Sequence, residues 1–376
     1  MSVTNYMEKL LEGVEVEWKA LGEVGKVCMC KRILKKQTSE TGDIPFYKIG
    51  TFGKKANAYI SQEVFNEYTV RFNYPKIGEV LISASGTIGR TVIFDGQDAY
   101  FQDSNIVWIE NNESQVLNKY LFYLYQIINW NIAEGGTIKR LYNDNLRKIQ
   151  IPIPPLNIQT EIVRILDTFT ELTAELTAEL TARKKQYHYY RDQLLSFEEG
   201  LVEWKALQMI AKIKHGKDWK KLGVGDIPVY GSGGVMTYVD TFSYDKPTVL
   251  IPRKGSIKNI FYVESPFWNV DTIYYTEIDT NQVIPKFFYY YMKTINLMNL
   301  DTGSGRPSLT QAILNEIKIP LPSPEEQARI VAILDKFDAL THSITEGLPR
   351  EIELRQKQYD YYRDLLLSFP KPKVEA

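Results

Sequence analysis

Hydrophobic residues recur with helical spacing in two long stretches of the chain. In the first stretch, apolar residues return every three or four positions over residues 158–180, and the same face resumes over residues 187–197. The second stretch repeats this pattern over residues 330–344 and again over residues 352–366. This spacing is typical of amphipathic helices that bury one face, and two such faces can pair. The sequence therefore predicts two long helices that pack against each other in antiparallel orientation.

Short strands are predicted outside these helices. The strand-like runs of β-branched and aromatic residues, separated by Gly, Asn and Asp, are residues 80–84, 105–109, 248–251 and 272–276. Such runs with turn residues between them are typical of β-strands. One shorter amphipathic helix is expected late in each set, at residues 117–129 and 285–296. The pattern therefore predicts two globular α+β domains.

The same blocks of sequence occur twice and in the same order. The paired blocks are VEWKAL at residues 16–21 and 202–207, GDIPFYKIG from Gly42 and GDIPVYGSG from Gly225, VLISASGTIG from Val80 and VLIPRKGSIK from Val249, IQIPIPP from Ile149 and IKIPLPS from Ile317, QTEIVRILDTF from Gln159 and QARIVAILDKF from Gln327, and RKKQYHYYRDQLLSF from Arg183 and RQKQYDYYRDLLLSF from Arg355. Near-identity is confined to the blocks that close each half, whereas the interiors share only short matched segments. A repeat of this kind predicts a common scaffold that carries two diverged domains.

The proline-rich segments IPIPP and IPLPSP end each globular part, because proline continues neither a sheet nor a helix. The predicted fold is α+β, with two globular domains related by a pseudo-twofold internal repeat and joined by two long antiparallel helices. Its parts are an N-terminal tail that completes the helical scaffold (residues 1–17), a first domain (18–155), a central helix (156–200), a second domain (201–323) and a C-terminal helix (324–376).

The two helical stretches are not equivalent. Glycine and proline in Gly-Leu-Pro at residues 347–349 should kink or restart the second helix. The N-terminal segment MEKLLEGVEVEW is also a shortened copy of the junction QLLSFEEGLVEW between the two halves. The chain thus resembles a circularly permuted repeat whose ends fall near one helix end. We expect the tail to lie beside the C-terminus.

Charge is distributed unevenly along the chain, although the formal net charge is only −1. Residues 18–155 hold 17 Lys and Arg against 13 Asp and Glu, and residues 204–323 hold 14 against 10, so each globular part is at +4. Residues 156–199 hold 5 against 8, and residues 324–368 hold 6 against 9, so each helix is at −3. Positive domains on negative helices would direct a polyanion to the domains. Differences this small also arise by chance on solvated faces.

The sequence contains no pattern typical of a catalyst. Cys28 and Cys30 lie too close together for a disulfide and lack a second pair for zinc, so we interpret them as reduced side chains. The three histidines share no motif, and the glycines of GSGGV from Gly231 lack the spacing of a nucleotide-binding fingerprint. We expect no catalytic, cofactor-binding or metal-binding residues. Without a membrane span or secretory signal in the sequence, we expect a cytoplasmic protein.

These blocks resemble the specificity subunits of type I restriction and modification enzymes. The resemblance spans essentially the whole chain and is carried by two variable domains that each lead through I-x-I-P-x-P or its counterpart into a helix ending in QYxYYRDxLLSF. The run TAELTAELTA at residues 173–182 is similar to the spacer repeat of one branch of that family. The resemblance implies that each domain reads one half of a split, asymmetric DNA target. A coiled-coil adaptor without DNA sequence readout is the alternative.

Basic residues beside small ones are the candidates for contact with double-stranded DNA, since cations bind phosphate and glycine lets the backbone approach it. The candidates are Ser85, Gly86, Thr87, Arg90, Gly136, Thr137, Lys139 and Arg140 in the first half, and Arg253, Lys254, Gly255, Lys258, Gly305 and Arg306 in the second. Each of them could equally belong to a hairpin turn with a solvated cation. Gln102, Asn105, Asn143 and Asn145 are further possible readers of adenine.

The resemblance also implies partner subunits that perform the chemistry. These are two modification subunits, which use S-adenosylmethionine to methylate adenine, and restriction subunits, which use ATP and Mg to translocate and cut DNA. The candidate docking residues on the helices are Arg183, Lys184, Tyr187, Tyr190, Arg355, Lys357, Tyr359 and Tyr362. Arginine and aromatic residues are favoured at interfaces. The alternative is that the tyrosines only pack the two helices together.

Overall fold

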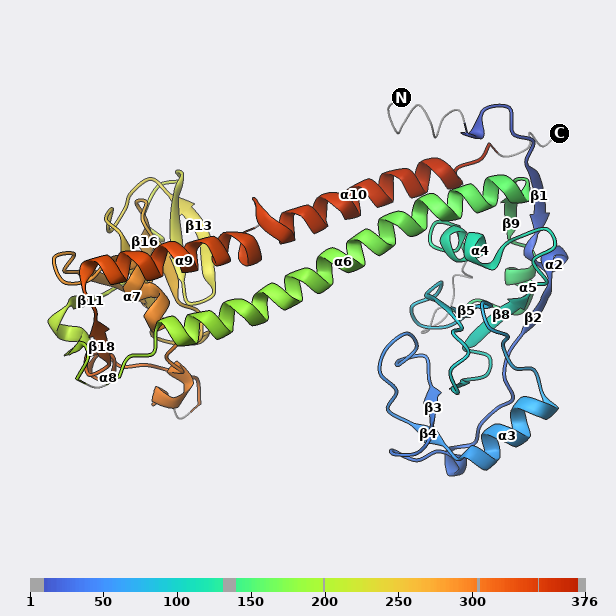
Figure 1. The fold of residues 1–376 in the computed structure, drawn as a ribbon, viewed down its shortest axis with the longest axis horizontal. Coiled ribbons are helices and arrows are strands. Elements are labelled where there is room, and N and C mark those ends of the chain that lie inside the picture. The colour runs from blue at the N-terminus through green and yellow to red at the C-terminus, as the bar shows by residue number, and fades with distance from the viewer. Residues whose placement is uncertain (1–9, 131–139, 199, 303–304, 344, 371–376) are drawn as a thin grey trace. The chain divides into compact units, whose positions relative to one another are not determined.

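The chain folds into two compact units, each built around one globular domain. The computed structural model describes residues 10–130, 140–198, 200–302, 305–343 and 345–370 (Figure 1). The first unit consists of residues 1–175 and 353–376, and the second consists of residues 176–352. Both boundaries between the units fall inside helices, namely α6 (Leu156–Leu194) and α10 (Gly347–Leu367). Each globular domain is therefore held by segments of two different helices.

Both domains contain the same three small sheets. In the first domain these are β1 (Glu17–Ala20) with β9 (Gln150–Ile153), then β2 (Lys26–Cys28), β8 (Ile106–Glu110), β5 (Val80–Ser83) and β6 (Thr91–Ile93), then β4 (Tyr59–Ile60), β3 (Ile44–Tyr47) and β7 (Tyr100–Phe101). In the second domain they are β10 (Glu203–Ala206) with β18 (Lys318–Leu321), then β11 (Ala211–His215), β17 (Ile273–Ile278), β14 (Thr248–Pro252) and β15 (Phe261–Val263), then β13 (Gly234–Val239), β12 (Ile227–Gly231) and β16 (Trp268–Asn269). The third sheet of each domain pairs two strands in parallel, β3 with β7 and β12 with β16. The sequence repeat is thus also a repeat of topology, and the predicted α+β fold is confirmed.

Short helices accompany the sheets. They are α2 (Leu21–Val24), η1 (Lys35–Gln37), α3 (Gln62–Arg71), α4 (Asn118–Leu124) and α5 (Asn143–Arg147) in the first domain, and η2 (Leu207–Met209), α7 (Pro285–Met292), η3 (Leu297–Leu300) and α8 (Gln311–Asn315) in the second. The four predicted strands are confirmed as β5, β8, β14 and β17. The helices predicted at residues 117–129 and 285–296 are shorter than expected. Each one tightens at its C-terminal end into hydrogen bonds that span three residues, such as Ile127 to Leu124 and Ile295 to Met292.

The central helix is continuous and the C-terminal one is broken. Helix α6 runs through the whole TAEL repeat, whereas α9 (Pro324–His342) and α10 are separated by residues 343–346. The break precedes the predicted Gly-Leu-Pro segment. Gly347 has a φ of +75°, and a Cβ there would lie 2.3 Å from the carbonyl oxygen of Ala339. Glycine is therefore required where the chain turns back over the end of α9, and Pro349 lies in the first turn of α10, where proline is tolerated.

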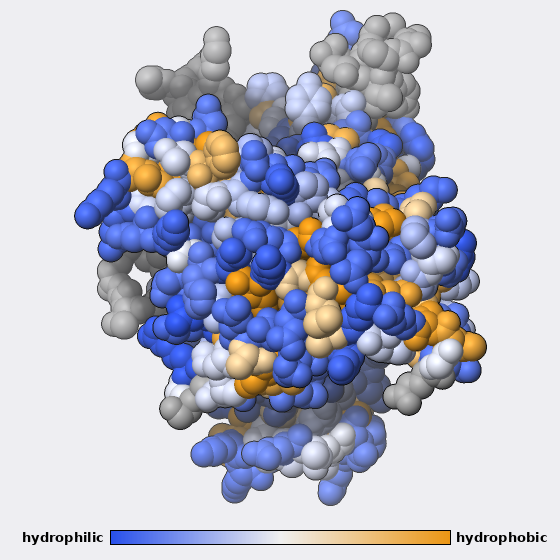
Figure 2. Space-filling view, turned by 90° about the vertical axis from the view of Figure 1, so that its left-hand side faces the viewer, coloured by the Kyte–Doolittle hydropathy of each residue, from blue (hydrophilic) through white to orange (hydrophobic). Residues whose placement is uncertain are grey.

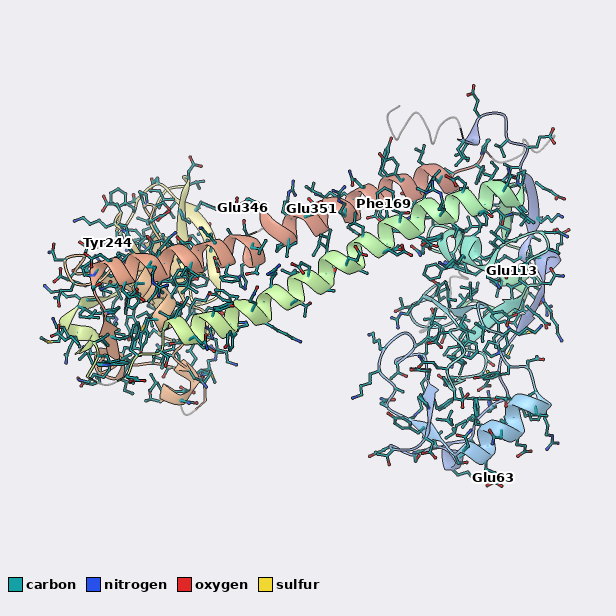
Figure 3. The ribbon with its side chains drawn as sticks, viewed as in Figure 1. Glu63, Glu113, Phe169, Tyr244, Glu346 and Glu351 are labelled. Atoms are coloured by element: carbon teal, nitrogen blue, oxygen red, sulfur yellow. The ribbon has the colours of Figure 1, made fainter. Side chains whose placement is uncertain are left out.

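Each domain is packed against the start of the helix that follows it and the end of the other helix. In the first unit, Phe169 of α6 stacks on Tyr362 of α10 with 5.4 Å between the ring centroids, on the side of α6 that faces α10 (Figure 3). In the second unit, Phe337 of α9 stacks in the same way on Tyr190 of α6 at 5.8 Å. The two units therefore use the same aromatic pair, with the roles of the helices exchanged.

A buried glutamine ties the start of each helix to its domain. The side-chain amide of Gln159 donates to the carbonyl oxygens of Gln115 (2.8 Å) and Pro154 (2.7 Å), and its oxygen accepts from the backbone N–H of Leu117 (2.9 Å). Gln327 makes the three equivalent bonds in the second unit, at 2.8 to 3.2 Å. Because a buried amide with three backbone partners has little freedom, the helix starts in a fixed orientation on each domain.

The described part of the N-terminal tail lies beside the C-terminal segment of the first unit, as the sequence predicts. The indole N–H of Trp18 donates to the carbonyl oxygen of Pro370 over 3.1 Å. Leu10 and Leu11 pack against the core that also contains Leu366 and Leu367. Segments from opposite ends of the chain therefore close one core.

Replacing Gln159 by alanine should destabilise the first unit by about 3 kcal/mol, because three buried backbone groups lose their partner. Gln327→Ala should have a similar effect on the second unit. Gln193, an exposed residue of α6, is the matched control, and its replacement by alanine should change stability by less than about 0.5 kcal/mol. Urea denaturation of the full chain measures the effect, and equal stabilities for all three variants would contradict it.

Candidate nucleic-acid interface

A tight turn after β5 holds four of the eight candidate DNA-binding residues of the first domain. Gly86 has a φ of +65°, which glycine adopts without strain, and Gly86 and Thr87 are exposed at the tip. Ser85 is buried and donates to the side-chain oxygen of Asn105 over 2.8 Å. The guanidinium of Arg90 donates to the carbonyl oxygen of Phe52 over 2.9 Å. The tip can therefore approach a ligand, whereas Ser85 and Arg90 hold the turn in place.

Arg140 reaches this turn from the other end of the domain. It forms an isolated antiparallel bridge with Ser85, and the next residue, Leu141, donates to the carbonyl oxygen of Ala84 over 2.8 Å. Its exposed guanidinium lies 3.4 Å from the side-chain oxygen of Asn105. Two stretches far apart in the sequence thus place a cation beside the glycine turn. Gly136, Thr137 and Lys139 lie outside the described residues.

The second domain repeats this arrangement of a glycine turn and a bridging segment, called the corner below, and its turn and bridging segment carry more basic residues than the described ones of the first domain. Lys254 forms an isolated bridge with Ser308, and the N–H of Gly255, whose φ is +84°, donates to the carbonyl oxygen of Pro307 over 3.0 Å. Lys254, Gly255, Lys258, Gly305 and Arg306 are all exposed. The guanidinium of Arg253 is held by the carbonyl oxygen of Asp271 at 3.2 Å. All six candidates of this half are described residues, and they lie on the turn itself or on the segment that reaches it.

A third segment, which was not predicted from the sequence, completes each corner. In the first domain it is the loop between β3 and β4, where the N–H of Ile49 donates to the side-chain oxygen of Gln102 over 3.0 Å and where Lys48, Lys54 and Lys55 are exposed. In the second domain it is the tip of the β12–β13 hairpin, where the side chain of Asn259 donates to the carbonyl oxygen of Ser232 over 3.0 Å. The signal was present in the sequence, because the repeated blocks from Gly42 and Gly225 end in these segments.

The other candidate readers are less accessible. Asn143 and Asn145 lie half-buried in α5, and Gln102 is half-buried with its side-chain oxygen bonded to Ile49. Asn105 shares its side-chain oxygen between Ser85 and Arg140. Gln102 and Asn105 therefore organise the corner of the first domain in the described structure.

Comparison with protein families identifies the chain. The model of the type I restriction modification DNA specificity domain matches residues 13–183 and again residues 202–354, so it covers both halves. The chain belongs to the type I specificity subunits. The EcoR124I/EcoR124II specificity subunit of Escherichia coli is 39% identical over 411 residues, which span 100% of this chain and 99% of that protein. This membership favours DNA readout over the adaptor interpretation.

Other type I relatives match the chain in part or in fold. A putative type I restriction enzyme specificity subunit of Haemophilus influenzae is 62% identical over 197 residues, and this match spans 51% of each chain. The crystal structure of the S subunit of a type I system from M. genitalium is 21% identical and has a TM-score of 0.63 over 97% of this chain and 99% of that chain. The fold of this specificity subunit is therefore that of a known S subunit.

In each copy of the repeated helical block of this specificity subunit, one tyrosine is more exposed than the others. Tyr187 and Tyr359, candidates for docking, are buried at 1% and 7% exposure inside their own units. Tyr190, which is 40% exposed, stacks on Phe337 of α9, and the half-buried Tyr362 stacks on Phe169 of α6. Their neighbours Tyr189 and Tyr361 are 59% and 57% exposed. The most exposed tyrosines, Tyr189 and Tyr361, are therefore outside the set of docking candidates, whereas the candidate Tyr190 is also exposed.

The candidate cations of the same block lie close to acidic side chains of their own helices. Arg183 pairs with Glu179 at 2.7 Å, and Lys357 pairs with Glu353. Arg183 also donates to the side-chain oxygen of Gln186 over 2.8 Å, and Arg355 makes the same bond to Gln358. Lys184 adds positive charge next to Arg183. Such exposed pairs contribute little to stability, so a partner can displace them at low cost.

The described side chains of this specificity subunit that could bind a metal or act as nucleophiles do not cluster. Within the described ranges, no three His, Cys, Asp or Glu side chains form a group that could hold a metal ion. Cys28 and Cys30 are buried free thiols, and burial raises the pKa of Cys30 to about 12. Among the helices described, none is both long and apolar enough to cross a membrane.

Replacing Lys254 and Lys258 by alanine should weaken DNA binding without changing the preferred sequence, because exposed lysines act on phosphates. Each loss should reduce the slope of log K against log salt by about 0.9 if the lysine neutralises one phosphate. Binding of the assembled complex to cognate and unrelated duplexes at several salt concentrations tests this. Lys318→Ala in β18 is the control, and an unchanged slope in the double variant would contradict the assignment.

Proposed function

We propose that each globular domain reads one half of a split, asymmetric DNA target and that the chain directs methylation and restriction by partner subunits without catalysing either. The observation that carries the proposal is the corner made in both domains from the same three segments: the turn after β5 or β14, the segment that bridges to it, and the loop or hairpin tip beside them. The two corners share a backbone plan and differ in their side chains. Different side chains on one plan would read different half-sites.

The spacing between the half-sites is assigned to the helices. The TAEL repeat lies within the continuous helix α6, and the boundary between the two compact units also falls in this repeat, between residues 175 and 176. A helix resists bending over this length, so the number of residues between the two domains sets their separation. The unread spacer of the target would then be measured by helix length instead of base contacts.

The chemistry is assigned to the partners. Two modification subunits would supply S-adenosylmethionine and methylate adenine, and restriction subunits would supply ATP and Mg for translocation and cleavage. The two copies of the repeated helical block support two equivalent docking sites for modification subunits. Tyr189 forms an edge-on contact with Tyr190 at 5.4 Å, and Tyr361 forms the same contact with Tyr362 at 5.2 Å. Tyr189 and Tyr361 would thus be the most exposed tyrosines of the two copies, each on a rigid helical base.

Methylation mapping tests the proposal directly. Genomic DNA from cells that express this chain with its modification subunits should carry one split, asymmetric methylated motif that is missing without the chain. An assembled complex that adds no motif would refute sequence readout and favour an adaptor role.

Deleting one tetrad, residues 173–176, should shorten the spacer of the motif by about one to two base pairs, because four helical residues rise by about 6 Å. Both half-sites should stay unchanged, since neither domain is altered. The substitution Thr177→Ala keeps the helix length and should leave the spacer as it is. An unaltered spacer in the deletion variant, with methylation retained, would show that α6 does not set the distance.

Replacing Tyr189 or Tyr361 by alanine should each weaken one docking site, by about tenfold in affinity for an interface anchor of this type. The double variant should lose both modification subunits, whereas each single variant should retain one. Mass measurement of the assembled complex at limiting concentration distinguishes these states. Val70→Ala, at an 86% exposed apolar position of α3, is the control. Full assembly of the double variant would rule out this docking surface.

A further inference from the structure

The β12–β13 hairpin of the second domain extends the DNA-facing corner. Its tip is fixed to the corner by two hydrogen bonds: Asn259 donates to the carbonyl oxygen of Ser232, and the N–H of Ser232 donates to the hydroxyl of Thr272 over 3.3 Å. A Cβ on Gly255 would lie 3.2 Å from the hydroxyl oxygen of Ser232. The hairpin therefore projects from the same surface as Lys254 and Lys258, and β13 is the edge strand of its sheet.

Three apolar side chains of this hairpin are exposed. Val235, Met236 and Tyr238 of β13 are 47%, 59% and 54% exposed, and residues 227–239 contain no charged side chain. The corresponding loop of the first domain instead presents lysines 48, 54 and 55. On the face of the second unit shown in Figure 2, hydrophobic residues reach the surface among hydrophilic ones. The two domains thus place opposite chemistry at the same point of the fold.

An apolar side chain cannot neutralise a phosphate, so a hairpin of this composition is suited to the bases. The major groove admits a two-stranded antiparallel ribbon, and the 5-methyl group of thymine is the apolar feature that it presents. We propose that the β12–β13 hairpin enters the major groove of the second half-site and that Met236 contacts a thymine methyl group. This inference rests on the proposed function. In the first domain, the lysines at this point contact phosphates.

Met236 is singled out by its position at the base of the tip. It is two residues beyond Gly234, which closes the turn with a φ of +111°. A Cβ on Gly231 would lie 2.6 Å from the sulfur of Met236, so the methionine side chain lies over the bare backbone of β12. This contact orients an otherwise flexible side chain beside the tip. Tyr238 lies further along the strand.

Removing the methyl group from the DNA tests the contact. Duplexes that carry the mapped motif are prepared with each thymine of the second half-site replaced in turn by deoxyuridine, and binding of the assembled complex is measured. The complex should lose roughly three- to fivefold in affinity at one thymine, as expected for one buried methyl group. The Met236→Ala complex should bind the thymine and uracil duplexes equally at that position. Thymines of the first half-site should respond identically in both complexes.

Met209→Ala is the matched control, because Met209 belongs to the same domain, is 62% exposed and lies in η2, apart from the corner. It should keep the full response to uracil. The inference is overturned if no thymine of the second half-site responds, or if Met236→Ala retains the response. Loss of partner subunits from the Met236→Ala complex, with an unaltered thymine response, would instead assign the hairpin to a protein contact. A wild-type complex without any split motif would overturn the proposed function as well.

Discussion

The packing of two different helix ends against each globular domain is the constraint on which the rest of the structure depends. The pair Phe169 and Tyr362 in the first unit, and the pair Phe337 and Tyr190 in the second, join the start of one helix to the end of the other. The buried glutamines 159 and 327 then fix each helix start to its domain. Because both units use the same contacts, the helical blocks cannot diverge freely. This explains why near-identity between the halves is concentrated in the segments that close them.

Within this constraint the two DNA-facing corners have diverged in charge and in apolar surface. The first corner has exposed lysines on its loop, and its arginine at position 90 is held by a carbonyl oxygen. The second corner has Lys254 and Lys258 on its turn and an uncharged hairpin beside them. A scaffold that fixes backbone geometry while leaving these side chains exposed allows each half-site to change independently. The small positive charge of each domain is consistent with this division, since the affinity for phosphate is spread over a few residues.

The sequence predicted the repeat, the fold class and the four main strands, because these depend on periodic patterns that occur twice. It did not predict which tyrosines are accessible. Tyr187 and Tyr189 differ by two positions on a helix, which changes the face they occupy, and only packing against Phe337 and His342 reveals that Tyr187 is buried. Only part of the corner was predicted, because its remaining contacts are also tertiary. Glycine and basic residues mark the turns, but the contact between Ser232 and Asn259 is tertiary, and GSGGV was identified only as lacking a nucleotide-binding pattern.

The division of the chain into units also has a consequence for its synthesis. The second unit is one continuous segment, residues 176–352, whereas the first also includes the C-terminal part of α10, whose Tyr362 covers α6 at Phe169. A ribosome therefore completes the second unit before the first, although the first domain emerges earlier. Until the last helix arrives, the core around Ile162 and Leu166 has an uncovered side, which is the kind of surface that chaperones bind. The segment that closes the first unit is thus synthesised only after the whole of the second unit.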